Sequence, residues 1–105
     1  MHTVTRLEIM ADSVELHKIT NVFDRAGNVT YTVLRNVSSH GVRGESGDDS
    51  NIASENNYII AFCPPESTKS LLEVIRPILN KFGGACFTSD AMQVKSMRCI
   101  VNMTS

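Results

Sequence analysis

The chain has 105 residues and a formal net charge of −1, and 42% of its residues are hydrophobic. This length predicts one domain with a modest core. The near-neutral net charge gives no electrostatic sign of a nucleic-acid-binding domain, in which a basic stripe is expected. No apolar run approaches the roughly 18–20 residues that span a bilayer.

The first half of the chain predicts a strand, a helix and a second strand. The segment TVTRLEIM, residues 3–10, alternates apolar and polar residues, as a half-buried strand does. The segment DSVELHKITNVFDRAG, residues 12–27, carries apolar side chains at helical spacing. The Asp12-Ser13 pair can cap this helix, and Gly27 can end it in the left-handed conformation. The segment NVTYTVLRNV, residues 28–37, is rich in β-branched and aromatic residues and predicts a strand.

The second half predicts another strand and another helix. The segment YIIAFC, residues 58–63, is almost entirely apolar, so we expect a strand that is covered on both faces. Residues 66–82 predict a helix whose cap is the side chain of Glu66 or Ser67. Pro77 removes a backbone donor from this helix, and we expect a kink there.

The segment ACFTSDAMQV, residues 85–94, predicts a fourth strand, and residues 99–101 a short terminal one. The order β-α-β-β-α-β predicts a ferredoxin-like α+β fold in a single domain, residues 1–105. Both helices then cover one face of the sheet. Apolar residues at both parities of the second and third strands suggest that other subunits cover its second face.

A long Ser-, Gly-, Asn- and Asp-rich connection separates the second and third strands. We place this loop at about 38–56 and a tail at about 95–105. Structureless loops beyond roughly 12–15 residues are usually functional or disordered. The beginning of the chain lacks the basic and apolar regions of a signal peptide, so we expect a cytoplasmic protein.

Catalytic and metal sites have little support in the sequence. The three histidines show no metal-binding spacing, and no His, Cys and acid are grouped to make a nucleophile. The three cysteines form no C-x-x-C pair and are expected to be small buried hydrophobes. We therefore expect no enzyme, no metal and no cofactor, and a small acyl or phosphate transferase is the disfavoured alternative.

Three cationic stretches could bind an anion. HGVRGESG places Arg43 between glycines, which let backbone N–H groups turn toward a phosphate. NKFGGACF places Lys81 before Gly83-Gly84, and the tail carries Lys95 and Arg98. Ordinary alternatives remain open: a flexible surface loop, a helix C-cap with a lysine favoured by the helix dipole, and a solvated tail.

The segment LEIMADSVELHKITNVFDRAGNVTYTVLRNVSSHGVRG resembles the opening of the PII signal-transduction superfamily. There a strand and a helix precede a Thr-Val strand that leads into a long T-loop. The resemblance implies a homotrimer in which the T-loop, a B-loop and a C-terminal segment surround an adenine nucleotide between subunits. The nucleotide is then a regulatory ligand rather than a cofactor, and ordering of the T-loop controls a partner protein.

Two departures refine the resemblance. The chain lacks the T-G-x-x-G-D-G-K-I run of the usual B-loop, and no tyrosine lies between Tyr31 and Tyr58. Both argue against nitrogen control by uridylylation. The chain looks closer to PII-like proteins of inorganic-carbon uptake: regulators of bicarbonate transporters and carboxysome-associated proteins, the latter with bicarbonate as a further effector. An ending without a Cys-bearing hairpin is more similar to the carboxysome-associated type.

By position, the resemblance implies a nucleotide site made of residues from the second strand, the T-loop base, the B-loop region and the tail. These residues are Thr32, Val33, Leu34, His40, Gly41, Arg43, Lys81, Gly83, Gly84, Lys95 and Arg98. The implied partner is a membrane transporter or a carboxysome-related protein. Alternatives on the same topology are a nitrogen-regulatory PII protein, a CutA-like trimer, an ACT-like amino-acid-binding module and a structural shell subunit.

Overall fold

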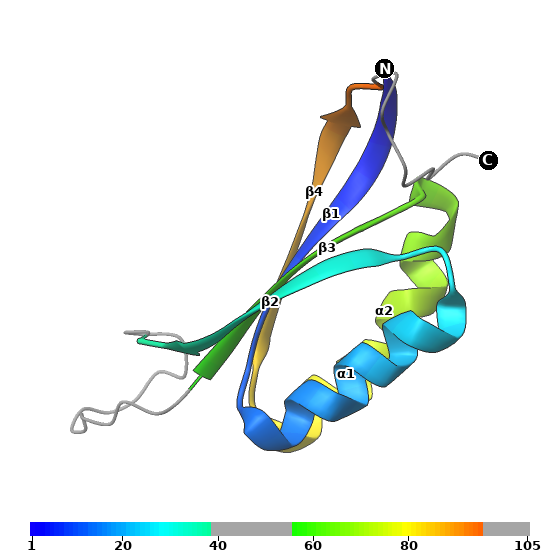
Figure 1. Cartoon of the computed structure of the whole chain (residues 1–105). Helices are drawn as coiled ribbons and strands as arrows, with labels where there is room; N and C mark the ends of the chain where they lie inside the picture. Colours follow the sequence, from blue (N-terminus) through cyan, green and yellow to red (C-terminus); the bar gives the residue numbers. More distant parts are fainter. Residues whose placement is uncertain (39–55, 96–105) are drawn as a thin grey trace.

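Two helices cover one face of a four-stranded antiparallel sheet (Figure 1). The structure is a computed structural model, and it describes residues 1–38 and 56–95. The elements are β1 (His2–Ala11), α1 (Ser13–Ala26), β2 (Thr30–Val37), β3 (Asn56–Cys63), the 3-10 turn η2 (Pro65–Ser67), α2 (Thr68–Phe82) and β4 (Ala85–Gln93). The strand order is β2-β3-β1-β4. This is the ferredoxin-like fold that the sequence predicts.

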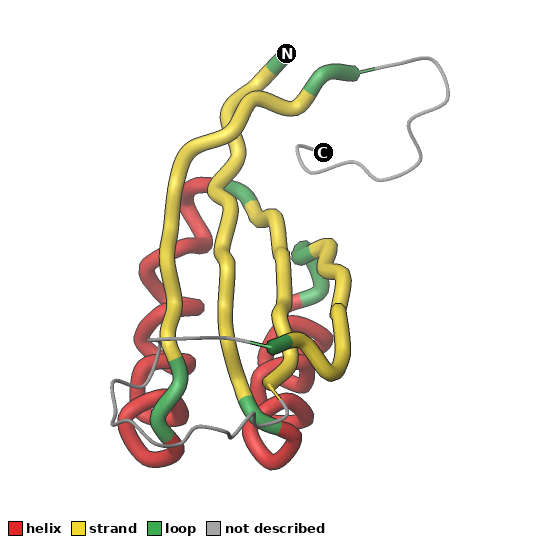
Figure 2. The backbone as a smooth tube through the Cα atoms, turned by 90° about the vertical axis from the view of Figure 1, so that its left-hand side faces the viewer, coloured by secondary structure: helices red, strands yellow, loops and turns green. Residues whose placement is uncertain are grey.

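The central strand β1 divides its side chains between two environments. Leu7 and Ile9 are fully buried, whereas Arg6 and Glu8 are half-buried. Successive residues of a strand point to opposite faces, so Leu7 and Ile9 face the helices and Arg6 and Glu8 face away from them. Figure 2 shows the helices lying together behind the strands. We call the side of the sheet without helices the open face.

Helix α1 has well-defined ends. The Asp12 side chain accepts hydrogen bonds from the N–H groups of Val14 and Glu15, and Glu15 Oε1 accepts the Asp12 N–H at 3.1 Å. This reciprocal pair is a capping box, so Asp12 rather than Ser13 is the cap. Gly27 takes the left-handed conformation and ends the helix, as predicted.

Helix α2 begins differently from the prediction. The Ser67 side chain makes no capping hydrogen bond, and Glu66 does not stand at the cap position. The 3-10 turn η2 already gives Ser67 a helical backbone, and its Oγ accepts a hydrogen bond from Asn28 Nδ2 at 3.1 Å instead. The helix then continues unbroken through Pro77. The kink at this residue stays a prediction.

The core lies between the helices and the sheet. Its buried apolar members are Leu7, Ile9, Ala11, Leu16, Ile19, Phe23, Ile59, Ala61, Cys63, Leu71 and Ile75. Tyr31 of β2 packs on Phe23 with ring centroids 5.4 Å apart, and its hydroxyl donates to Asp24 at 2.8 Å. On β3, Ile60 and Phe62 remain half-buried on the open face, so within one chain only the helix side of this strand is fully covered. The strand predicted at 99–101 lies outside the described residues.

Candidate functional site

The ends of β2 and β3 frame the long connection between them. The two strands pair in register as far as Leu34 and Tyr58, and the register then shifts. In the irregular stretch Asn36 has a left-handed φ of 59°, and its N–H donates to Asn57 Oδ1 at 3.4 Å. Asn56 and Asn57 are both buried. This irregularity and the Asn57 side chain therefore fix the place where the chain leaves the sheet.

The turn between α2 and β4 is tightly packed. Gly83 is left-handed, with a φ of 87°, and its N–H donates to Leu79 O at 2.7 Å, as a helix C-cap requires. A Cβ on Gly84 would lie 2.5 Å from the carbonyl oxygen of Met10 and 2.8 Å from Leu79 Cδ2. Gly84 thus lets this turn lie directly against the end of β1.

Two lysines gather at the same turn. The Nζ atoms of Lys81 and of Lys18 each lie 5.6 Å from the centroid of the Phe82 ring. Lys81 comes from α2 and Lys18 from α1, so both helices bring positive charge to the turn. Sequence reasoning singled out Lys81 only, because nothing in the sequence places Lys18 beside it.

The three predicted residues of β2 divide between the two faces of the sheet. Thr32 pairs with Ile60, and Leu34 pairs with Tyr58, on the open face. Val33 packs against the buried core on the helix side. Side chains of Thr32 and Leu34 could therefore contact one ligand together, whereas Val33 could contribute to that contact through its backbone.

One line of strand pairs joins the base of the long loop to the α2–β4 turn across the sheet. Leu34 pairs with Tyr58, Tyr58 with Met10, and Met10 with Ala85. The edge strands β2 and β4 are three strand spacings apart, which is roughly 14 Å. The base of the long loop and the turn at Gly84 thus lie at the same end of the sheet but at opposite edges.

Lys95 lies at the other end of the molecule. β4 has 9 residues and runs from Ala85 to Gln93, a length of roughly 30 Å. Lys95 follows its far end, so within one chain it does not approach Lys81. Four more predicted residues lie outside the described residues: His40, Gly41, Arg43 and Arg98.

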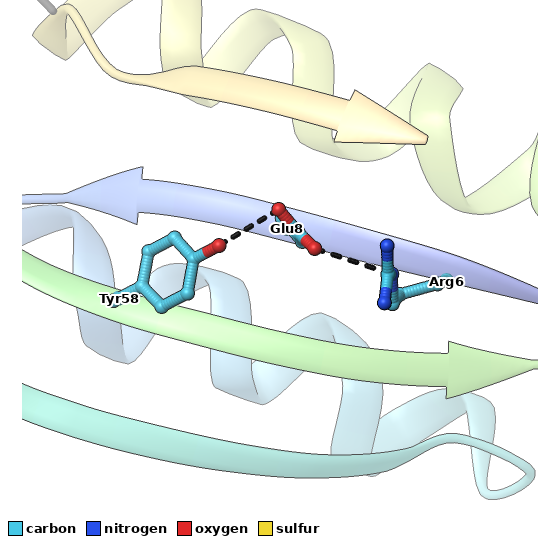
Figure 3. Close-up of polar contacts among 3 residues, drawn as sticks. All are labelled: Arg6, Glu8 and Tyr58. Carbon is cyan, nitrogen blue, oxygen red and sulfur yellow. Dashed lines mark hydrogen bonds and ion pairs between the residues drawn. The ribbon is translucent and has the colours of Figure 1, made fainter. Parts of the chain in front are cut away.

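A chain of polar contacts crosses the open face (Figure 3). The Tyr58 hydroxyl donates to Glu8 Oε1 at 2.7 Å, and Arg6 Nε lies 3.1 Å from Glu8 Oε2. The hydrogen bond to Glu8 raises the pKa of Tyr58 above its ordinary value, and burial and the Glu8 charge act in the same direction. Sequence reasoning missed these three residues, because their proximity depends on the register of β1 and β3.

Other chemistry has little basis in the described part of the chain. Residues 1–38 and 56–95 contain no group of three or more potential metal ligands. Burial raises the pKa of the Cys63 and Cys86 thiols, which disfavours the reactive thiolate. Among the described helices, none is long and apolar enough to cross a membrane.

Comparison with known proteins gives a family and several related structures. Residues 4–99 match the family described as Nitrogen regulatory protein P-II. A structure of CPII from Thiomonas intermedia K12, a nitrogen regulatory PII-like protein bound to ADP, AMP and bicarbonate, is 30% identical with a TM-score of 0.71. The match covers 88% of this chain and 89% of that chain.

Two further structures extend this likeness. CPII bound to ADP, AMP and acetate is 29% identical with a TM-score of 0.73, over 90% of this chain and 91% of that chain. A putative PII-like signalling protein from Thermus thermophilus is 15% identical with a TM-score of 0.68, over 89% and 91% of the two chains, and shares the fold. Comparison with curated proteins gives no match.

Proposed function

The chain belongs to the nitrogen regulatory protein P-II family, in its PII-like branch, and from this premise we propose that it is an adenine-nucleotide-binding regulator. The observation that carries the proposal is the likeness to CPII, whose structures hold ADP, AMP and bicarbonate. This likeness extends over most of both chains. We place the regulator in the cytoplasm, where adenine nucleotides are abundant.

The nucleotide site lies between subunits of a homotrimer in this proposal. The end of β2 and the α2–β4 turn support it, because they lie at one end of the sheet but at opposite edges of the same chain. One subunit contributes Thr32, the Val33 backbone and Leu34. The α2–β4 turn of a neighbour contributes Lys81 and the glycines at 83 and 84.

The long loop supplies the remaining groups of the site. His40, Gly41 and Arg43 form its base in the sequence, and Arg43 offers a forked donor to phosphate. We assign Lys95 and Arg98 to the same nucleotide from a subunit other than the one that contributes Lys81, because Lys95 stands far from Lys81 within one chain.

Nucleotide binding then changes the state of the loop, which docks on or leaves a partner protein. A ligand can drive such a change only as far as it binds the two loop states differently. We propose that bicarbonate is a second effector and that the partner is a bicarbonate transporter or a carboxysome-related protein. CPII bound to bicarbonate supports this choice of effector.

Calorimetry tests the ligand directly. The intact protein is titrated with AMP, ADP, ATP and cyclic AMP, each with and without bicarbonate. We expect saturable binding of at least one adenine nucleotide, with one site per subunit. Absence of heat and of thermal stabilisation with all four nucleotides would refute the proposed function.

Matched variants test the position of the site. Lys81→Ala and Arg43→Ala each remove a charge-assisted hydrogen bond, which contributes about 1.5–3 kcal/mol and so lowers nucleotide affinity roughly tenfold or more. Lys69→Ala is the control, because Lys69 is exposed at the opposite end of α2. Ligand-induced thermal stabilisation should fall in the first two variants and persist in the control. Equal effects at Lys69 and Lys81 would contradict this placement.

A further inference from the structure

The open face combines apolar residues with one polar chain at its centre. Glu8 stands between Phe87 of β4 and Ile60 of β3 in the strand register. Phe87 is 64% exposed, and Leu34 of β2, on the same face, is 45% exposed, so this face presents several apolar side chains to water. Arg6, Glu8 and Tyr58 form the polar chain on this face (Figure 3).

Covering this face with another molecule costs desolvation free energy, because the face carries charged side chains. The Arg6 side chain is 43% exposed and the Glu8 side chain 28% exposed, so water still solvates both. Excluding that water costs free energy for each ion unless a partner compensates it. Glu8 provides the compensation inside the subunit, because one of its oxygens lies at 2.7 Å from the Tyr58 hydroxyl and the other at 3.1 Å from Arg6 Nε.

The same contacts indicate which molecule fits the face. Arg6 and Glu8 neutralise each other, so the centre of the face offers no net charge to a strongly charged partner. The contact at Arg6 Nε has the distance of an ion pair, but it is not an aligned hydrogen bond within the described residues. The Arg6 side chain as a whole is 43% exposed, so its remaining guanidinium donors can meet an acceptor on a facing surface. A face that carries both signs and apolar residues can meet further copies of the same chain around a symmetry axis, because each copy supplies both charges and apolar area to its neighbours.

We propose that Glu8 determines self-assembly of this chain, by keeping Arg6 paired when further copies cover the open face. Tyr58 holds the Glu8 carboxylate in position from the neighbouring strand. The inference rests on the proposed homotrimer and names the residue on which its formation depends. It also assigns the exposed Phe87 and half-buried Ile60 to the contact between copies.

The test compares two chemically identical changes by sedimentation and light scattering over a range of protein concentrations. Glu8→Gln leaves Arg6 as an unpaired charge on the covered face, and we expect an association constant at least about tenfold lower. Glu73→Gln is the control, because Glu73 is an exposed residue of α2 and should leave assembly unchanged. Circular dichroism establishes that each variant is folded.

A double variant keeps the inference testable if Glu8→Gln simply perturbs the fold. Arg6→Met with Glu8→Gln removes the unpaired charge, so assembly should return to within a few-fold of the wild type. Failure of the double variant to recover would overturn the inference, as would a Glu8→Gln protein that assembles like the wild type. A wild-type protein that stays monomeric overturns the proposed trimer itself, so the two failures are distinguishable.

Discussion

The two faces of the sheet are made by the same strands but differ in how their side chains are buried. On the helix face, Leu7, Ile9 and Ile59 are fully buried, and the chain completes this packing by itself. On the open face, the neighbouring residues of the same strands are charged, aromatic or half-buried. Burial of apolar side chains stabilises the fold in proportion to the area removed from water. The helix face therefore stabilises the single chain. The apolar side chains of the open face stay exposed in the single chain and can be buried only by contact with another molecule.

Each face also holds one tyrosine hydrogen-bonded to a carboxylate. Tyr31 donates to Asp24 on the helix side, and Tyr58 donates to Glu8 on the open face. The first pair joins β2 to α1 within the fold. The second joins two strands at a surface where a partner is expected. A tyrosine–carboxylate hydrogen bond thus stabilises the fold on the helix face and orders side chains of the contact surface on the open face.

The largest expected difference between the faces comes from apolar truncation. Ile9→Ala removes a fully buried side chain and should lower the free energy of unfolding by about 2–5 kcal/mol at every protein concentration. Phe87→Ala should instead reduce the dependence of unfolding on protein concentration, because its effect is on assembly. Urea denaturation at several concentrations measures both. A concentration-independent loss for Phe87→Ala as large as that for Ile9→Ala would break the comparison.

A smaller change in the free energy of unfolding is expected at the α2–β4 turn, where Gly84 packs against the end of β1. Gly84→Ala forces a Cβ toward the Met10 carbonyl and should cost about 1–3 kcal/mol of unfolding free energy. Gly27→Ala is the matched change: its φ is +80°, but no atom lies within 4 Å of an added Cβ. Left-handed strain alone should cost about 1 kcal/mol there. Equal destabilisation of both variants in urea would show that the α2–β4 turn accommodates a Cβ at Gly84 more easily than its close packing indicates.

The smallest effect concerns tyrosine ionisation. The hydrogen bond to Glu8 raises the pKa of Tyr58, so its contribution to stability is complete below pH 10 and is lost as the pH rises through the folded-state pKa. In a Tyr31→Phe background, Glu8→Gln should lower the pKa of Tyr58 in an absorbance titration, and Glu73→Gln should not. An unchanged Tyr58 pKa in the Glu8→Gln variant would show that the hydrogen bond between Tyr58 and Glu8 is absent in solution.

Sequence patterns predicted the elements well, because their signals are local. The capping Asp12, the terminal Gly27 and the alternation along β1 each depend on residues close in sequence. The Ser67 cap was wrong, since the preceding 3-10 turn had already set the backbone of this residue. Its hydroxyl accepts from Asn28, a partner that no local pattern could have indicated.

The candidate site was less accessible to sequence reasoning, because it depends on register and on distance across the sheet. Position alone grouped Lys81 with Lys95, and the length of β4 separates them within one chain. Asn57 and Lys18 were missed because the contacts that make them relevant join distant segments. The residue type of Asn36, near the end of the predicted strand, was a usable signal, because asparagine enters the left-handed conformation more readily than most residues, and Asn36 does so.

The end of β2 and the α2–β4 turn lie at one end of the sheet but at opposite edges, and this placement has a consequence for mixtures of chains. If each nucleotide site takes one edge from each of two subunits, a chain damaged at Leu34 still carries a sound α2–β4 turn. A chain damaged at Lys81 still carries a sound β2 edge. Neither variant alone makes an intact site, yet a mixed assembly restores one wherever the two sound edges meet. Complementation between inactive variants would therefore be built into the geometry of the fold.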